Sequence, residues 1–129
     1  MNIPFVETVG IQKGMLTNNE SVQNHLGSIH AGAQFTFAEA ASGKYLSSLV
    51  PELQGKIVPL LRESSIKYKK QAFSTLRSEV TIEEEALKDF LAKFEAKGRA
   101  SIVAKVTLYD EENDVTCVGS FKWFVQKID

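Results

Sequence analysis

Four residues in one short stretch have the types and spacing of a catalytic site. Asn24 lies six residues before His30, and Glu39 lies nine residues after it. Gly32 stands between them and allows a ligand to approach the backbone closely. A carboxylate whose pKa is raised by apolar surroundings can work as a general base near neutral pH. Backbone N–H groups at the start of a helix lack intrahelical partners and can stabilise an oxyanion. The stretch therefore indicates acid–base chemistry at a polarised carbonyl group.

A long, mostly apolar helix is expected to carry these residues, from about His30 to Leu49. Apolar side chains cover most of its circumference, which is typical of a helix enclosed by other elements. Val50-Pro51 and Gly55 are expected to end the helix and to form a turn. One stripe of the helix is small and polar around a single acid, since its members recur every three or four residues: Gly32, Thr36, Glu39, Gly43 and Ser47.

Most of the remaining chain has the pattern of β-strands. Before the long helix, residues 2–8 form a short helix or strand, and residues 9–16 resemble a strand interrupted by two glycines. After it, alternation of apolar and polar residues and the turn residues between segments predict antiparallel strands. The extended segments are expected over four ranges: 57–73, 74–82, 99–109 and 115–125.

One further helix is expected over residues 83–97, with a single apolar stripe on one side. Thr81 and Glu84 have the spacing of a capping box, and Gly98 is expected to end the helix. A curved antiparallel sheet wrapped around the long central helix satisfies this order of elements. The sequence therefore predicts an α+β fold in a single domain over residues 1–129.

The composition of the chain argues against several classes of function. The chain has 129 residues, of which 43% are apolar and 24% charged, as in ordinary globular proteins. A net charge of −1 argues against a nucleic-acid-binding surface. No segment approaches the ~20 apolar residues of a membrane span, and the N-terminus has no signal-peptide pattern. The single cysteine, Cys117, fits a reducing compartment, so we expect a cytoplasmic protein. Two histidines without a nearby acid give no metal-binding spacing.

Asn24, the run His30-Ala31-Gly32 and Glu39 together resemble the signature of hot-dog-fold thioesterases. The most similar groups are the phenylacetate-pathway and 4-hydroxybenzoyl-CoA types and a related branch of uncharacterised domains. These families carry Asn or Gln six residues before a His-Gly-Gly, and Asp or Glu nine residues after the His. The order of expected elements resembles the hot-dog fold over essentially the whole chain. The resemblance implies an acyl-CoA thioesterase, with coenzyme A as part of the substrate and no other cofactor.

The resemblance also implies a role for each residue. Glu39 would be the general base for water or the nucleophile, and Asn24 would position the water or the carboxylate. His30 would orient the loop, and the N–H of Ala31 or Gly32 would stabilise the oxyanion. On one helix, however, Glu39 lies roughly 13 Å in rise from His30. In the resembling families the acid of one subunit faces the helix start of its partner, which implies a homodimer or a dimer of dimers.

Three positions depart from the family pattern. Ala31 replaces the first glycine, which is tolerated where its φ is negative. Gly43 stands where some relatives place a threonine four residues after the acid. Other members of these families carry a catalytic serine at a strand position that falls near Leu61 here. Ser64 and Ser65 are expected to be out of register with that position.

Basic residues near this strand suggest how coenzyme A could be held. Lys67, Lys69 and Lys70 could attract its phosphates by charge. Two alternatives to hydrolysis remain open. One is a hot-dog hydratase or dehydratase, in which His30 must reach the substrate as a base. The other is a non-catalytic protein that binds acyl-CoA or an acyl carrier, in which the pocket persists without turnover.

Overall fold

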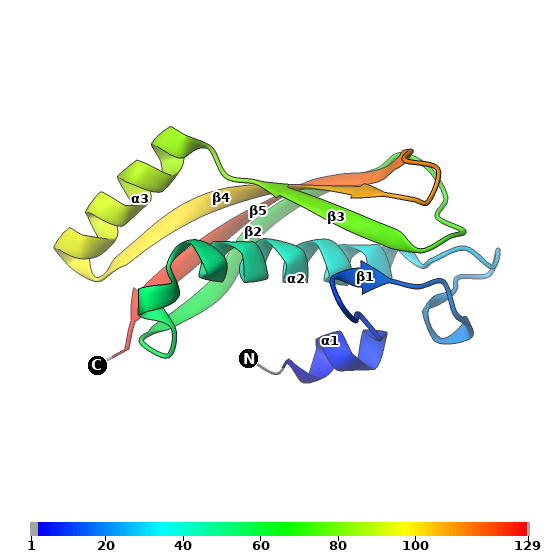
Figure 1. The fold of residues 1–129 in the computed structure, drawn as a ribbon, viewed down its shortest axis with the longest axis horizontal. Coiled ribbons are helices and arrows are strands. Elements are labelled where there is room, and N and C mark those ends of the chain that lie inside the picture. The colour runs from blue at the N-terminus through cyan, green and yellow to red at the C-terminus, as the bar shows by residue number, and fades with distance from the viewer. Residues whose placement is uncertain (1–2, 129) are drawn as a thin grey trace.

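A five-stranded antiparallel sheet curves around one long helix, α2, in the computed structural model of the chain (Figure 1). The structure describes residues 3–128, so Met1, Asn2 and Asp129 of the expected domain lie outside the described residues. This arrangement confirms the predicted α+β class. The described elements are, in order, α1 (Pro4–Val9), β1 (Met15–Leu16), α2 (Ala31–Leu49), β2 (Ile57–Tyr68), β3 (Leu76–Thr81), α3 (Glu84–Lys97), β4 (Arg99–Tyr109) and β5 (Val115–Lys127), with 3-10 turns at Glu20–Val22 and Pro51–Leu53.

The strands lie in the order β1-β3-β4-β5-β2, which makes β2 an edge of the sheet. β4 and β5 form the hairpin that their alternating sequence predicts, and β2 pairs along the other side of β5. Pro59 lies within β2, where it is tolerated because an edge strand can leave an N–H position unpaired. Among residues 3–128, no strand covers the outer edge of β2.

The core lies between α2 and the concave face of the sheet. Burial alternates along β4 as a strand with one face on a core requires. α1 lies on the side of α2 away from the sheet (Figure 1). None of the helices in residues 3–128 combines the length and apolar character needed to cross a bilayer. The largest fully buried side chains include residues of α2, α3, β3, β4 and β5: Phe37, Leu46, Phe90, Leu76, Leu108, Phe121 and Val125.

Several expected boundaries were wrong. The strand expected over residues 9–16 is reduced to Met15–Leu16, because Gly10 and Gly14 adopt positive φ and turn the chain. The capping box is not formed: the N-cap of α3 is Glu83, and no side chain caps it. Thr81 instead pairs with Lys105 as the last residue of β3. A local spacing rule failed here because pairing in the sheet delays the start of the helix.

Candidate active site

The start of α2 is capped by His30. Its Nδ1 accepts a hydrogen bond from the Gly32 N–H at 2.8 Å, so in the neutral ring the hydrogen lies on Nε2. The His30 carbonyl accepts from the N–H groups of Ala33 and Gln34. Ala31 is the first helical residue and has no positive φ, so its methyl group is tolerated in place of glycine. Of the two expected oxyanion donors, Gly32 is thus engaged, and the Ala31 N–H has no partner within residues 3–128.

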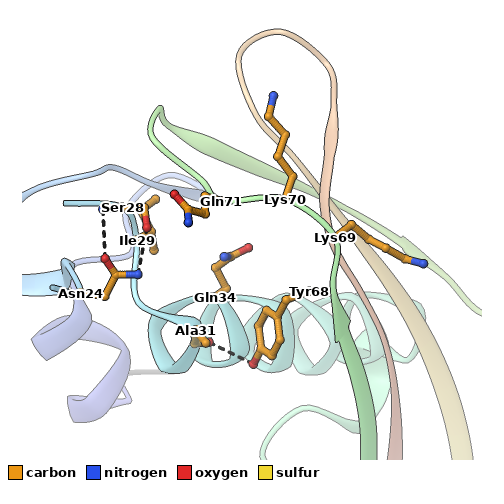
Figure 2. Close-up of a pocket in the computed structure, with 9 residues that line it drawn as sticks. All are labelled: Asn24, Ser28, Ile29, Ala31, Gln34, Tyr68, Lys69, Lys70 and Gln71. Atoms are coloured by element: carbon orange, nitrogen blue, oxygen red, sulfur yellow. Dashed lines mark hydrogen bonds between the residues drawn. The ribbon is translucent and has the colours of Figure 1, made fainter. Parts of the chain in front are cut away.

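A pocket of about 320 Å³ opens beside this helix start (Figure 2). The loop before α2 forms one wall, and the chain leaving β2 forms the other. The Tyr68 hydroxyl donates to the Ala31 carbonyl at 3.1 Å and ties the second wall to the helix. The pocket therefore brings together residues far apart in the sequence, and its lining consists of Asn24, Ser28, Ile29, Ala31, Gln34, Tyr68, Lys69, Lys70 and Gln71.

Asn24 uses its side chain to shape the first wall. Its Oδ1 accepts from the N–H groups of Leu26 at 2.9 Å and Ser28 at 3.2 Å. Its Nδ2 donates to the Ser28 Oγ at 2.9 Å (Figure 2). An amide oxygen has two lone pairs, so Oδ1 is fully occupied by the loop. The side chain of Asn24 is placed at the pocket, but most of its hydrogen-bonding capacity holds the loop itself.

Lys70 is engaged by acids of the turn between β4 and β5. Its ammonium lies 2.9 Å from an Asp110 carboxylate oxygen and 2.7 Å from one of Asp114, with Glu112 at 3.8 Å. The hydrogen bonds that Lys70 donates to Asp114 and Asp110 raise the pKa of Lys70, and the lysine in turn lowers the pKa of Asp110. The expected contact of Lys70 with coenzyme A phosphates therefore competes with its neutralisation of three carboxylates.

The other two expected phosphate contacts lie apart from each other. Lys69 lines the pocket and makes no ion pair with any residue from 3 to 128. Lys67 pairs with Val118 in the sheet and does not line the pocket. Because side chains alternate along a strand, Lys67 lies on the face opposite Tyr68, whose hydroxyl reaches α2. The structure thus leaves Lys69 as the free cation of the pocket wall, among the described residues.

Glu39 lies half-buried on α2, away from this pocket. Burial raises the pKa of its carboxyl group. One turn earlier, the ring of Phe35 packs edge-on against Phe121 of β5, with centroids 5.6 Å apart. Three residues later, the Ser42 hydroxyl accepts a hydrogen bond from the Trp123 indole at 2.8 Å. This side of the helix therefore faces β5. Within residues 3–128, Glu39 makes no ion pair.

The register of β2 differs from the expected one. Leu61 pairs with Trp123 and Ser64 pairs with Phe121, both of which point toward the helix. The pairing is irregular between Leu61 and Glu63, so Ser64 shares the inner face with Leu61, although positions 61 and 64 would face opposite sides on a regular strand. Ser64, expected to be out of register, therefore lies on the face that looks toward α2.

The glycine that replaces a threonine of some relatives has a packing reason. A Cβ atom at Gly43 would lie 3.1 Å from Cζ2 and 3.2 Å from Cη2 of Trp123. The indole is held in place by its hydrogen bond to Ser42. A threonine at position 43 would therefore require the Trp123 ring to shift against its hydrogen bond to Ser42.

Gln34 and Tyr68 are among the pocket residues that were not expected from the sequence. Gln34 is 3% exposed, and its Oε1 accepts a hydrogen bond from the Thr116 hydroxyl at 3.0 Å. Tyr68 is tied to the helix start as described above. A polar residue inside an apolar run was the signal that marked Glu39, and the same signal marks Gln34. Tyr68 has no comparable signal, since a tyrosine in a strand is common.

Solved bacterial structures share this architecture. A Pseudomonas aeruginosa protein of unknown function, called a probable thioesterase, has a TM-score of 0.75 over 98% of this chain and 89% of its own, at 20% identity. A Bacillus halodurans protein with CoA has a TM-score of 0.75 over 97% of this chain and 77% of its own, at 21% identity. A Haemophilus influenzae thioesterase has a TM-score of 0.69 over 95% of this chain and 82% of its own, at 16% identity. The likeness establishes the hot-dog fold.

Sequence comparison places the chain in a family. No curated protein gives a significant match. The family described as a domain of unknown function, DUF4442, matches residues 3–125. The matched range includes the whole pocket lining and Glu39. The chain therefore belongs to the DUF4442 family, and it has the hot-dog fold.

Proposed function

We propose that this protein is an acyl-CoA thioesterase whose complete site forms between two copies of the chain. One observation carries the proposal. Glu39 is a half-buried carboxylate without an ion pair among residues 3–128, on the same helix whose start opens into the pocket. Such a group costs stability and has no structural partner in the chain, which favours a chemical role. The thioesterases among the similar structures, and the one with CoA, support the substrate class.

The chemistry uses two groups that one chain cannot bring to the same atom. Ala31 begins α2 and Glu39 follows eight residues later, a rise of about 12 Å along the helix. A second copy related by a two-fold axis would place its Glu39 against the first copy's helix start. The uncovered edge of β2 is the surface at which two sheets could join.

In this scheme the thioester carbonyl oxygen accepts a hydrogen bond from the Ala31 N–H. The partner subunit's Glu39 removes a proton from water, and the water oxygen attacks the carbonyl carbon. The negative charge moves to the carbonyl oxygen, where the N–H and the positive end of the helix stabilise it. Collapse breaks the carbon–sulfur bond, and the protonated Glu39 returns its proton to the thiolate. The products are a carboxylate, coenzyme A and one proton, and the scheme needs no bound cofactor.

Coenzyme A is proposed to lie along the wall formed by the chain leaving β2. Lys69 supplies a cation without an ion pair among residues 3–128. Lys67 is exposed on the same strand and would reach only a phosphate on the outer face. Lys70 would contribute only where a phosphate displaces Asp114. A Lys69→Ala variant should therefore weaken binding more than Lys67→Ala or Lys70→Ala.

The decisive experiment replaces Glu39 with glutamine, which keeps the shape of the side chain and removes the base. Release of free thiol from a panel of acyl-CoA thioesters is measured for both proteins. We expect kcat to fall roughly 10²–10⁴-fold, the usual contribution of a positioned base. Glu95→Gln, an exposed acid of α3, is the matched control. Equal turnover by the wild type and Glu39→Gln would refute the mechanism.

A non-catalytic acyl-CoA or acyl-carrier binder is the second candidate. It is favoured by Asn24, whose amide is committed to its own loop and leaves little capacity to hold a water molecule. Calorimetry with acyl-CoA separates the two functions, since a binder would show saturable binding without thiol release. The hydratase alternative fits less well. His30 accepts at Nδ1 from Gly32, so its other ring nitrogen carries the hydrogen and is a donor, not a base.

A further inference from the structure

Gln34 is a buried amide with one half of its hydrogen-bonding capacity unused. Its side chain rises from α2 into the space between the loop of Asn24 and the segment that follows Tyr68 (Figure 2). It is only 3% exposed, and its Oε1 is bound to the Thr116 hydroxyl. Its Nε2 donates to no residue from 3 to 128. Because no fully buried side-chain N or O in that range lacks a partner, this nitrogen must reach the space of the pocket.

The orientation of the amide follows from Thr116. This hydroxyl is fully buried, and its one hydrogen-bond partner within residues 3–128 is Gln34. A buried O–H that donates to nothing costs roughly 1–3 kcal/mol. If the amide were reversed, Nε2 would donate to the hydroxyl oxygen and leave that O–H unpaired. The arrangement that satisfies Thr116 therefore leaves the NH₂ group of Gln34 directed at the pocket.

A break in the sheet brings Thr116 to this position. Thr116 and Cys117 are neighbours on β5, yet both are fully buried, whereas neighbours on a regular strand face opposite sides. The β4–β5 register shifts between Leu108 and Tyr109, where Thr116 is the extra residue. Bulges of this kind re-aim side chains and are common beside active sites. The Thr116 carbonyl also accepts from the Lys69 N–H at 2.8 Å, so one residue fixes both Gln34 and the pocket wall.

We propose that Gln34 is the second oxyanion donor of the site, a substrate-contacting residue that hydrogen-bonds the carbonyl oxygen of the bound acyl group. This inference rests on the proposed function. With the Gly32 N–H held by His30, the helix start offers one N–H, from Ala31. Side chains on a helix point back toward its N-terminus, so the amide of Gln34 covers the turn that contains Ala31. The two donors can therefore meet at one oxygen.

The first test measures carbonyl binding without any turnover. The probes are two coenzyme A derivatives with equal chain lengths: an S-(2-oxoalkyl) ketone, which resists hydrolysis and keeps a carbonyl, and the S-alkyl thioether, which lacks it. The side-chain amide signals of Gln34 are assigned in ¹⁵N NMR spectra by their loss in Gln34→Leu. We expect both probes to bind and only the ketone to shift these signals strongly. Binding of both probes with equal shifts, or with none, would overturn the proposal.

The second test uses turnover. Gln34→Glu retains an acceptor for Thr116 but loses the NH₂ donor, so a purely structural role predicts near wild-type kcat. An oxyanion donor predicts that kcat falls roughly 10²–10³-fold in both Gln34→Glu and Gln34→Leu, with KM changed only a few-fold. Gln54→Leu, outside the pocket, is the control for the substitution. Thermal unfolding confirms that each variant is folded, and a near wild-type kcat in folded Gln34→Leu would refute the role.

The two tests separate this inference from the proposed function. If the wild type cleaves no thioester but the ketone shifts the Gln34 signals, hydrolysis is refuted and carbonyl recognition by Gln34 stands. If thioesters are cleaved and Gln34 responds to neither test, the thioesterase stands without this donor. If neither probe binds and no thioester is cleaved, both are refuted.

Discussion

Glu39 combines two properties that rarely occur together in a stable protein. It lies half-buried on a helix that packs against the core, and it makes no ion pair with residues 3–128. Asp110 is also buried, but Lys70 and backbone N–H groups stabilise its charge. The contrast between these two carboxylates separates an acid that holds a turn from an acid that remains available for chemistry.

The pH dependence of turnover follows from burial of Glu39. Burial raises the pKa of this carboxyl above its ordinary value of 4.5. A general base works deprotonated, so activity is present above the pKa and is lost as the pH falls through it. We expect the acid limb of kcat/KM to have its inflection above pH 4.5. Rates measured from pH 4 upward check this, with denaturation excluded at each pH by circular dichroism. The residual kcat/KM of Glu39→Gln should not fall at low pH in this way. If the same fall persists in this variant, another titrating group causes it.

At the scale of elements, α2 packs closely against β5 at Gly43, where the Trp123 ring lies next to the helix. Replacing Gly43 with threonine should push its side chain into Trp123, where a Cβ alone already lies 3.1 Å from the ring. Overpacking of this kind costs about 1–3 kcal/mol. The measurement is urea denaturation, with Ser47→Thr, one turn further along the same stripe, as the matched control. Equal stability of Gly43→Thr and Ser47→Thr would show that the Trp123 indole moves to accommodate the added side chain.

The same elements show which features a sequence can reveal. The apolar run from His30 to Leu49 and the alternation along β4 are local features, so they predicted the long helix and the hairpin correctly. The catalytic role of Glu39 stays a prediction. The pairing of Gln34 with Thr116 joins residues 82 positions apart. It depends on a bulge whose position is set by long-range strand register, which local alternation does not encode. The same reason applies to Ser64, which an irregularity in β2 turns toward the helix.

At the scale of the whole molecule, the proposed mechanism requires a site shared by two chains. The helix start and its pocket lie at one end of α2, and Glu39 lies about 12 Å along the same helix. A native mass equal to one chain would contradict a shared site. A dimer or tetramer alone would not establish it, because oligomers also form for other reasons. The stronger test asks whether two defective chains can repair each other.

Ala31→Pro and Glu39→Gln are the two chains to combine. Proline removes the Ala31 N–H, yet fits the first position of a helix, where that N–H has no intrahelical partner. His30, with φ −58° and ψ 141°, already has a backbone conformation that precedes proline readily. Each variant alone should be nearly inactive. In a mixed dimer, one site receives the intact Ala31 from one chain and the intact Glu39 from the other.

Co-expression of the two variants with different affinity tags should therefore restore activity. Random pairing makes half of the dimers mixed, and each mixed dimer has one working site of two, so about a quarter of wild-type activity is expected for a two-fold symmetric site. Purification through both tags should raise this to about half, since only mixed dimers remain. If both groups acted within one chain, no mixed dimer would contain a complete site. Mixed dimers purified in this way and found inactive would then place the whole reaction within a single chain.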